Sequence, residues 1–238
     1  MKIIEKIAKK AKDANNPRPT IAFFGDSVTE GCFELEVRRS GGFNNVFDRE
    51  SVYHKKVSEI LGVLFPTVPL NIINAGIAGT DAAYGLSRIE RDVISKKPDL
   101  TVVCFGLNDC GKEEAGLSEY VESLRGIFAR LRESGSEIIF MTPNMMCENV
   151  SELIHSDFAE LAETLSERQN RGVLDSYMDA ARALCREEGI PVCDVYAKWK
   201  RMSELGVNVT ELLSNKLNHP TREMHNLFAT SLVETILQ

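Results

Sequence analysis

Polar residues suited to nucleophilic catalysis follow short apolar runs in this sequence. Gly25-Asp26-Ser27 comes directly after one run, and Gly106-Leu107-Asn108 comes after another. A serine hydroxyl becomes a nucleophile when a base removes its proton, and N–H donors then stabilise the developing oxyanion. The sequence therefore predicts Ser27 as a candidate nucleophile and Asn108 as a candidate oxyanion donor.

A third motif, Asn74 to Thr80, follows another apolar run and contains Gly79. Glycine lets a backbone N–H approach a substrate closely, so Gly79 is a further candidate oxyanion donor. Taken singly, each of these motifs is also typical of a turn, with Asp26 or Ser27 capping a helix. Asp26 and Glu30 would repel a phosphate, which argues against a nucleotide-binding loop of the flavodoxin kind.

The chain has four candidate bases: His54, His155, His219 and His225. His54 lies inside a helical pattern, His155 lies beside a helix start, and His225 is expected to pack or to cap a helix. His219-Pro220 instead lies in a polar stretch before the last helical segment. A loop histidine at that place can reach the strand ends, so we predict His219 as the general base.

These residues must be positioned by a regular frame, and the apolar pattern supplies one. Five short runs, each too short for a helix and nearly all apolar, are typical of parallel strands buried on both faces. They are Thr20–Phe24, Leu70–Asn74, Leu100–Phe105, Glu137–Met141 and Ile190–Cys193. Amphipathic helical segments separate them, which predicts a three-layer α/β/α sandwich. In such sheets ligands bind beyond the carboxyl ends of the strands, where the polar motifs lie.

The chain is expected to form a single domain over residues 1–238. Residues 1–16 have apolar side chains on one helical face and predict an N-terminal docking helix. Residues 142–172 are longer than a usual connection and predict an inserted loop with a helix over Asp157–Arg168.

Composition narrows the range of partners. The net charge is −7 without a basic tract, which argues against nucleic acid as a partner. The apolar runs are too short to span a bilayer, and we expect no membrane partner. Six scattered cysteines form no CxxC pair, so we expect no metal site and no cofactor. A cytoplasmic protein with free thiols is the simplest interpretation.

Taken together, the motifs resemble the four sequence blocks of the SGNH (GDSL) hydrolase family. The blocks are Gly25-Asp26-Ser27, Asn74 with Gly79, Gly106-x-Asn108-Asp109 and His219-Pro220, in the family's order over almost the whole chain. The resemblance implies a flavodoxin-like five-stranded sheet of order 2-1-3-4-5. It also implies Ser27 as nucleophile, His219 as base, and an oxyanion hole formed by Ser27, Gly79 and Asn108.

The sequence departs from this family where the histidine-orienting acid is expected. The family has Asp-x-x-His, but Lys216 stands three residues before His219. In serine proteases, loss of the orienting acid lowers turnover by about 10⁴-fold. Three alternatives remain: a Ser–His dyad oriented by a backbone carbonyl or by the side-chain oxygen of Asn215 or Asn218, a distant carboxylate such as Asp194, or loss of catalysis. We favour the dyad, and Asp194 has the pattern of a helix cap.

The expected function is a serine esterase that forms an acyl-enzyme and cleaves short-chain, chiefly acetyl, esters of a carbohydrate or small molecule. Lysophospholipase or thioesterase activity at the same site is an alternative. A ligand-binding module that has lost catalysis is a second alternative, and Lys216 motivates it.

Overall fold

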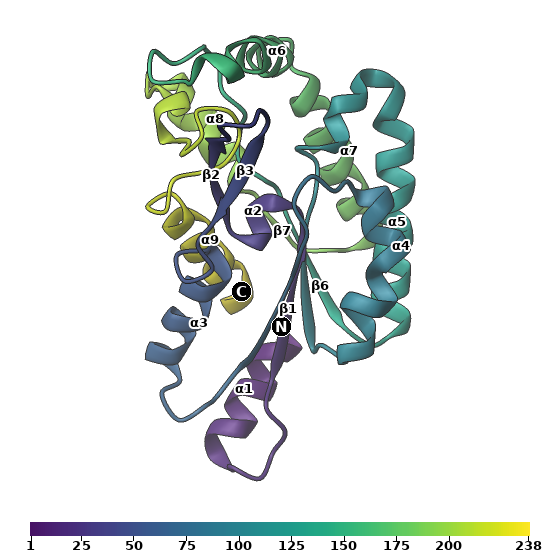
Figure 1. The fold of residues 1–238 in the computed structure, drawn as a ribbon. Coiled ribbons are helices and arrows are strands. Elements are labelled where there is room, and N and C mark those ends of the chain that lie inside the picture. Colours follow the sequence, from purple (N-terminus) through teal and green to yellow (C-terminus); the bar gives the residue numbers. More distant parts are fainter.

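A parallel sheet forms the centre of the computed structural model, which describes residues 1–238 (Figure 1). Its strands are β1 (Thr20–Gly25), β4 (Asn71–Gly76), β5 (Leu100–Cys104), β6 (Glu137–Met141) and β7 (Val192–Cys193). They are hydrogen-bonded in the order β4-β1-β5-β6-β7, and every neighbouring pair is parallel. Counted among these strands alone, the order is 2-1-3-4-5. The predicted flavodoxin-like α/β sandwich is therefore confirmed.

Helices cover both faces of the sheet (Figure 1). One layer contains α3 (Tyr53–Leu64) and α9 (His225–Leu237), with α1 (Lys2–Lys12) and α8 (Val195–Glu204) packed against α9. The other contains α4 (Ala82–Asp92), α5 (Leu117–Glu133) and α7 (Val173–Glu188). No helix combines the length and the apolar character needed to cross a membrane.

The sequence pattern explains why these elements form. On α5, the side chains of Tyr120, Leu124, Ile127 and Leu131 recur at helical spacing, and all of them are buried. On β1, every residue after Thr20 is buried, as expected for a central strand covered by helices on both faces. These side chains belong to one continuous hydrophobic core that runs through both layers.

The predicted bounds shift by a few residues at several elements. β7 is shorter than its apolar run, and β4 continues two residues past Asn74. The inserted helix, α6 (Ala159–Asn170), begins two residues later than predicted and follows a short 3₁₀ turn. The N-terminal helix ends at Lys12 and buries Ile3 and Ile7, which is consistent with docking.

A β-hairpin that the sequence analysis did not predict stands beside the strand ends. Its strands, β2 (Cys32–Val37) and β3 (Phe43–Phe47), pair antiparallel. The aromatic ring of Phe43 on the hairpin packs edge-on against Phe158, just before α6, with centroids 5.7 Å apart. In Figure 1 the hairpin and α6 both lie beyond the carboxyl ends of the sheet strands, above the predicted site.

Candidate active site

The turn after β1 places Ser27 at the mouth of the sheet. Ser27 begins a single helical turn, α2 (Ser27–Glu30), and Asp26 caps it by accepting a 3.0 Å hydrogen bond from the Val28 N–H. A side chain on Gly76 would overlap the backbone of Glu30, so glycine is required for this turn to pack against β4. Because Ser27 is the first residue of the turn, its N–H has no acceptor within the helix.

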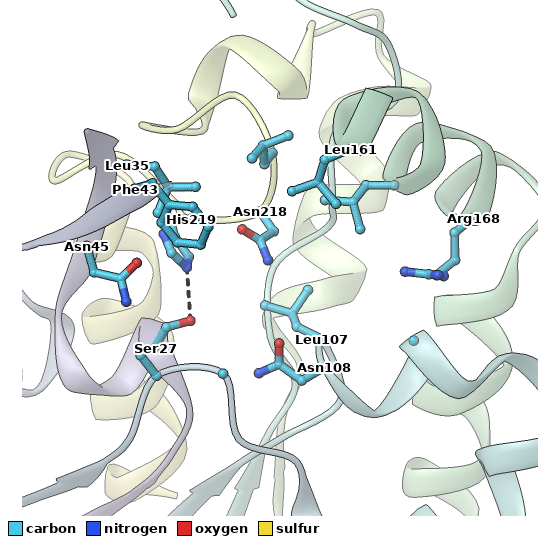
Figure 2. A pocket seen from close by; sticks show the side chains of 15 residues that line it. Ser27, Leu35, Phe43, Asn45, Leu107, Asn108, Leu161, Arg168, Asn218 and His219 are labelled. Carbon is cyan, nitrogen blue, oxygen red and sulfur yellow. Dashed lines mark hydrogen bonds between the residues drawn. The ribbon is translucent and has the colours of Figure 1, made fainter. Parts of the chain in front are cut away.

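His219 lies directly over Ser27, although 192 residues separate them in the sequence. Its Nε2 is 2.9 Å from the Ser27 Oγ (Figure 2). Its Nδ1 is 3.3 Å from the backbone carbonyl oxygen of Phe33 on β2. A carbonyl can only accept a hydrogen bond, so Nδ1 carries the proton and Nε2 is left to accept the serine hydroxyl. This tautomer is the one a general base requires.

Burial sets the charge of the groups around Ser27. The pKa of His219 falls from 6.5 to about 4 because burial disfavours the imidazolium, although the Phe33 carbonyl partly opposes this shift. The imidazole is therefore neutral at pH 7 and can accept a proton. Burial also raises the pKa of Asp26 to about 7, and the nearby Asp109 carboxylate adds to that shift. The pKa of Asp109 itself rises to about 6 for the same reason, burial.

The three side chains considered as partners of the imidazole ring do not bind it. The Asn215 Oδ1 accepts hydrogen bonds from the N–H groups of Leu217, Asn218 and His219, so it orders the loop. The Asn218 Oδ1 accepts a hydrogen bond from the Asn215 Nδ2. Asp194 caps α8 and pairs with Arg182. The alternatives with Asn215, Asn218 or Asp194 as the orienting group were wrong, and the interpretation of Asp194 as a helix cap is confirmed. A backbone carbonyl, that of Phe33, faces the imidazole instead.

The side chain of Lys216, which occupies the position of the missing acid, pairs with the carboxylate of Glu211. Its Nζ lies 2.9 Å from Glu211 Oε2 and donates to the Glu211 carbonyl oxygen at 3.1 Å. Its backbone has a φ of 58°, the left-handed region that few side chains adopt. The lysine therefore neutralises Glu211 and does not supply the imidazole with a partner.

The two other predicted oxyanion donors line the same cavity as Ser27. The Asn108 Nδ2 donates one hydrogen bond to the Thr80 carbonyl oxygen at 2.9 Å, which fixes the amide and leaves its second N–H available. Gly79 has a φ of 75°, and nothing lies within 4 Å of the place where a side chain would start. The structure thus brings Ser27, Gly79, Asn108 and His219 together.

An arginine that the sequence analysis missed joins the hairpin to the histidine loop. The Arg222 Nε donates to Asp48 Oδ2 at 2.8 Å, and Nη2 donates to Glu34 Oε2 at 3.1 Å. Its guanidinium carbon also lies 4.4 Å from the centroid of the Phe33 ring. Arg222 thereby holds the residue that supplies the carbonyl close to the loop that supplies the imidazole. Only its place three residues after His219 could have drawn attention to it.

A second missed arginine supports the floor of the site from below. Arg88 on α4 is 4% exposed and donates to the carbonyl oxygens of Gly25 and Ala75 at 2.9 and 2.7 Å. These carbonyls lie at the carboxyl ends of β1 and β4, so Arg88 fixes the spacing of the two strands just before the loops that carry Ser27 and Gly79.

The cavity over Ser27 has a volume of about 380 Å³ and mixed walls. The floor supplies polar groups, while the hairpin, α6 and the histidine loop supply Leu35, Phe43, Leu161, Leu165 and Leu217 (Figure 2). The rim is therefore more apolar than the floor. No group of three or more metal-binding side chains is placed to hold an ion.

A flavodoxin-like sheet with a serine–histidine pair at its carboxyl edge defines the SGNH class of hydrolase folds. The chain belongs to the GDSL-like lipase/acylhydrolase family, whose model matches residues 23–227. The resemblance noted from the four sequence blocks is thus confirmed.

Individual relatives match part of the sequence and most of the fold. An acetylxylan esterase of Geobacillus stearothermophilus is 28% identical over 132 residues, which are 52% of this chain and 58% of that protein. An uncharacterised lipoprotein of Bacillus subtilis, YqeF, is 27% identical over 142 residues, 57% of each chain. The chain thus matches under two thirds of the length of these curated relatives.

Among solved structures, Axe2, an acetylxylan esterase from Geobacillus stearothermophilus, superposes with a TM-score of 0.67 at 21% identity. That match covers 92% of this chain and 94% of Axe2. A two-domain esterase, CEX, active on acetylated mannans, superposes with a TM-score of 0.67 at 22% identity, covering 98% of this chain and 52% of the other. At these identities the likeness establishes the fold.

Proposed function

We propose that this protein is a serine esterase that removes short acyl groups, chiefly acetyl, from carbohydrate or other small-molecule esters. The observation that carries the proposal is the 2.9 Å contact between Ser27 Oγ and His219 Nε2, with Nδ1 facing the Phe33 carbonyl. The dyad provides what nucleophilic catalysis requires: a hydroxyl, a neutral base and an acceptor that fixes the tautomer of that base.

In the proposed reaction, Ser27 Oγ attacks the ester carbonyl carbon while its proton passes to His219 Nε2. The oxyanion of the tetrahedral intermediate lies among the N–H groups of Ser27, Gly79 and Asn108. The imidazolium then protonates the leaving alkoxide, and an acyl-enzyme remains on Ser27. Water loses a proton to Nε2, attacks the acyl carbon and releases the acid.

His219 faces the backbone carbonyl of Phe33 and not the carboxylate expected in the family, and this difference affects the turnover number in a predictable way. Its partial charge stabilises the imidazolium less than a full negative charge does. The position of the ring and its tautomer are nevertheless fixed by the 3.3 Å contact with Phe33. We therefore expect a working enzyme with a lower turnover number than a Ser-His-Asp enzyme on the same activated ester.

The comparisons support the acetyl and carbohydrate parts of the proposal. Two proteins that resemble this chain act on acetylated xylan and acetylated mannans, respectively. The small cavity, about 380 Å³, is consistent with a short acyl group together with part of the alcohol.

The test is hydrolysis of 4-nitrophenyl esters from acetate to palmitate by the wild type, Ser27→Ala and Ser87→Ala. Ser87 is exposed on α4, away from the site, so its variant controls for loss of any serine. We expect the highest rate on acetate and a loss of at least about 10³-fold in Ser27→Ala, with the melting temperature nearly unchanged. Ser87→Ala should match the wild type.

Other outcomes separate the alternatives. A rate that peaks on long chains would favour the lysophospholipase or thioesterase alternative over a short-chain esterase at the same serine. Absence of Ser27-dependent hydrolysis, together with no labelling of Ser27 by a fluorophosphonate, would instead favour a binding module without catalysis.

A further inference from the structure

One lining residue of the cavity carries a permanent charge. Of the fifteen residues around the cavity, Arg168 is the only arginine, and there is no lysine, aspartate or glutamate among them. Arg168 lies on α6, on the opposite side of the cavity from Ser27 and His219 (Figure 2). Its side chain is only 15% exposed.

Only one nitrogen of the Arg168 guanidinium is hydrogen-bonded within the protein. The Arg168 Nε donates to Glu113 Oε1 at 3.0 Å, and no other protein acceptor binds the side chain. The terminal nitrogens are therefore left for a ligand or solvent. Glu113 also faces Arg171 at 3.3 Å, so two guanidinium groups share one carboxylate. Arg171 also lies 4.0 Å from Glu167, so the charges of this cluster balance, and the group available at the cavity is the unpaired end of the Arg168 guanidinium.

The walls between the dyad and Arg168 are largely apolar, with the amides of Asn108 and Asn218 on the side nearer the dyad (Figure 2). Leu107, Leu161 and Leu165 line this part of the cavity. A ligand that reaches from the serine to the arginine must therefore place apolar atoms in the middle and an anionic group at its far end. A partly desolvated guanidinium binds a carboxylate through two parallel N–H···O bonds more strongly than it binds a neutral hydroxyl.

We propose that Arg168 is a carboxylate-binding residue that makes this enzyme prefer esters with an acidic group remote from the scissile bond. This inference rests on the proposed esterase function and names its substrate class. The carboxylate belongs either to the alcohol part, as in an acetylated acidic sugar, or to the acyl part, as in the half-ester of a dicarboxylic acid.

The test compares matched anionic and neutral substrates for each source. For the alcohol part the pair is 4-acetoxybenzoate and 4-acetoxybenzamide. For the acyl part the anionic substrate is mono-4-nitrophenyl adipate, and the neutral substrate is methyl 4-nitrophenyl adipate. The uncatalysed rate of each ester is subtracted. The quantity measured is the anionic-to-neutral ratio of kcat/KM in the wild type, Arg168→Gln, Arg168→Lys and Arg171→Gln. Arg171 is the matched control, because it pairs with the same Glu113 but does not line the cavity.

We expect Arg168→Gln to lower this ratio about tenfold or more for one of the two substrate pairs. Arg168→Lys should give an intermediate ratio, because it keeps the charge and loses the planar fork. Arg171→Gln should leave the ratio unchanged. An unchanged ratio in Arg168→Gln for both pairs would overturn the inference, as would an equal decrease in Arg171→Gln.

Binding without turnover provides a second measurement. Titration calorimetry of 4-acetoxybenzoate and of mono-methyl adipate into Ser27→Ala, with and without Arg168→Gln, should show at least one of the two anions losing affinity in the double variant. Equal affinity of both anions for the single and double variants would count against Arg168. If the wild type shows no Ser27-dependent hydrolysis of neutral esters, the proposed esterase function fails, whereas this binding test still decides the role of Arg168.

Discussion

The floor and the rim of the cavity are built in different ways. The floor consists of Ser27, Gly79 and Asn108, each a few residues after a sheet strand and held by local bonds such as the Asp26 cap. The rim consists of the hairpin Cys32–Phe47, helix α6 and the loop that carries His219. Its defining contact, between His219 Nδ1 and the Phe33 carbonyl, joins residues 186 positions apart. The floor thus depends on strand ends, and the rim on tertiary packing.

This difference assigns separate tasks to the two regions. In the proposed mechanism the floor supplies the nucleophile and the oxyanion donors, which sheet topology brings together. The rim would fix the tautomer of the base and shape the space for the substrate. Changes in the floor should therefore lower kcat strongly, whereas changes in the rim should alter the base or the substrate preference by smaller factors.

Two asparagines of the cavity give the largest contrast between floor and rim. We expect Asn108→Ala to lower kcat on 4-nitrophenyl acetate by about 10²- to 10³-fold, the usual effect of losing one oxyanion donor. Asn45→Ala on β3 removes an amide that lines the same cavity from the exposed hairpin, and should change kcat less than about threefold. Steady-state kinetics of both variants test this contrast.

The melting temperatures of these variants serve as a control. Asn108→Ala also removes the donor to the Thr80 carbonyl, a loss of about 1 kcal/mol of stability. If Asn45→Ala lowered kcat as strongly as Asn108→Ala, the division of tasks between floor and rim would be wrong.

The pH dependence of the reaction tests how the rim encloses the base. With the pKa of His219 lowered to about 4, kcat/KM should stay nearly constant from pH 7 to pH 5.5. A base with the ordinary pKa of about 6.5 would retain only about a tenth of its activity at pH 5.5. A midpoint near 6.5, with the protein still folded, would mean that solvent reaches the imidazole.

Acid should lower the stability of the folded state below about pH 6.5, and the sign follows from linkage. Burial lowers the pKa of His54, His219 and His225 to about 4, 4 and 3, respectively, so the folded state favours their neutral forms. This stability is fully present above pH 6.5 and is lost as pH falls through 6.5 toward the folded pKa values. Fluorescence of the single buried tryptophan, Trp199, reports unfolding and separates it from loss of the base.

Arg222 tests the positioning of the imidazole within the rim. Arg222→Gln removes the ion pairs to Glu34 and Asp48 and should let the Phe33 carbonyl move away from Nδ1. We expect kcat to fall about three- to tenfold with KM for 4-nitrophenyl acetate unchanged, because Arg222 does not line the cavity. Arg222→Lys should recover part of the loss.

The control for this variant is a second arginine–carboxylate pair, which joins two helices and not the histidine loop and the hairpin. Arg130→Gln removes the 2.9 Å pair with Glu90, which joins α5 to α4 away from the cavity. Arg130→Gln should leave kcat unchanged even where its melting temperature falls as much as that of Arg222→Gln. Equal losses of kcat in both variants would show that Arg222 acts through stability alone.

Sequence patterns could locate the floor because its signals are local. The buried runs of β1 and β5 are nearly continuous in apolar residues, and the residues after them are Gly25-Asp26-Ser27 and Gly106-Leu107-Asn108. Burial on both faces forces that composition, and parallel topology places both strand ends at one edge.

The rim could not be located in this way. The hairpin strands are short, and β3 is largely exposed and has no buried stripe. Only the Ser40-Gly41-Gly42 turn could have indicated a hairpin. The partner of the imidazole is a main-chain carbonyl, and every residue has one, so no residue type marks Phe33. Asn215 was a reasonable candidate by composition, yet its oxygen accepts from the backbone N–H groups of Leu217, Asn218 and His219 and not from the imidazole.

The Lys216→Asp variant tests whether a carboxylate at the family's position improves catalysis. We expect it to have the smallest effect of the variants considered. Lys216→Asp places a carboxylate at the family's position, but the side chain there points to Glu211, 2.9 Å from the ammonium. The new carboxylate would face Glu211 and not the imidazole, because the Asn215 side chain and the Phe33 carbonyl hold the loop and the ring as they are. We therefore expect kcat/KM within about twofold of the wild type and a slightly lower melting temperature from repulsion between the two carboxylates.

Lys216→Gly is the matched control, since it removes the charge and suits the φ of 58°. A tenfold rise in kcat for Lys216→Asp alone would mean that the loop rearranges to form a triad, and that the carbonyl is only a substitute partner.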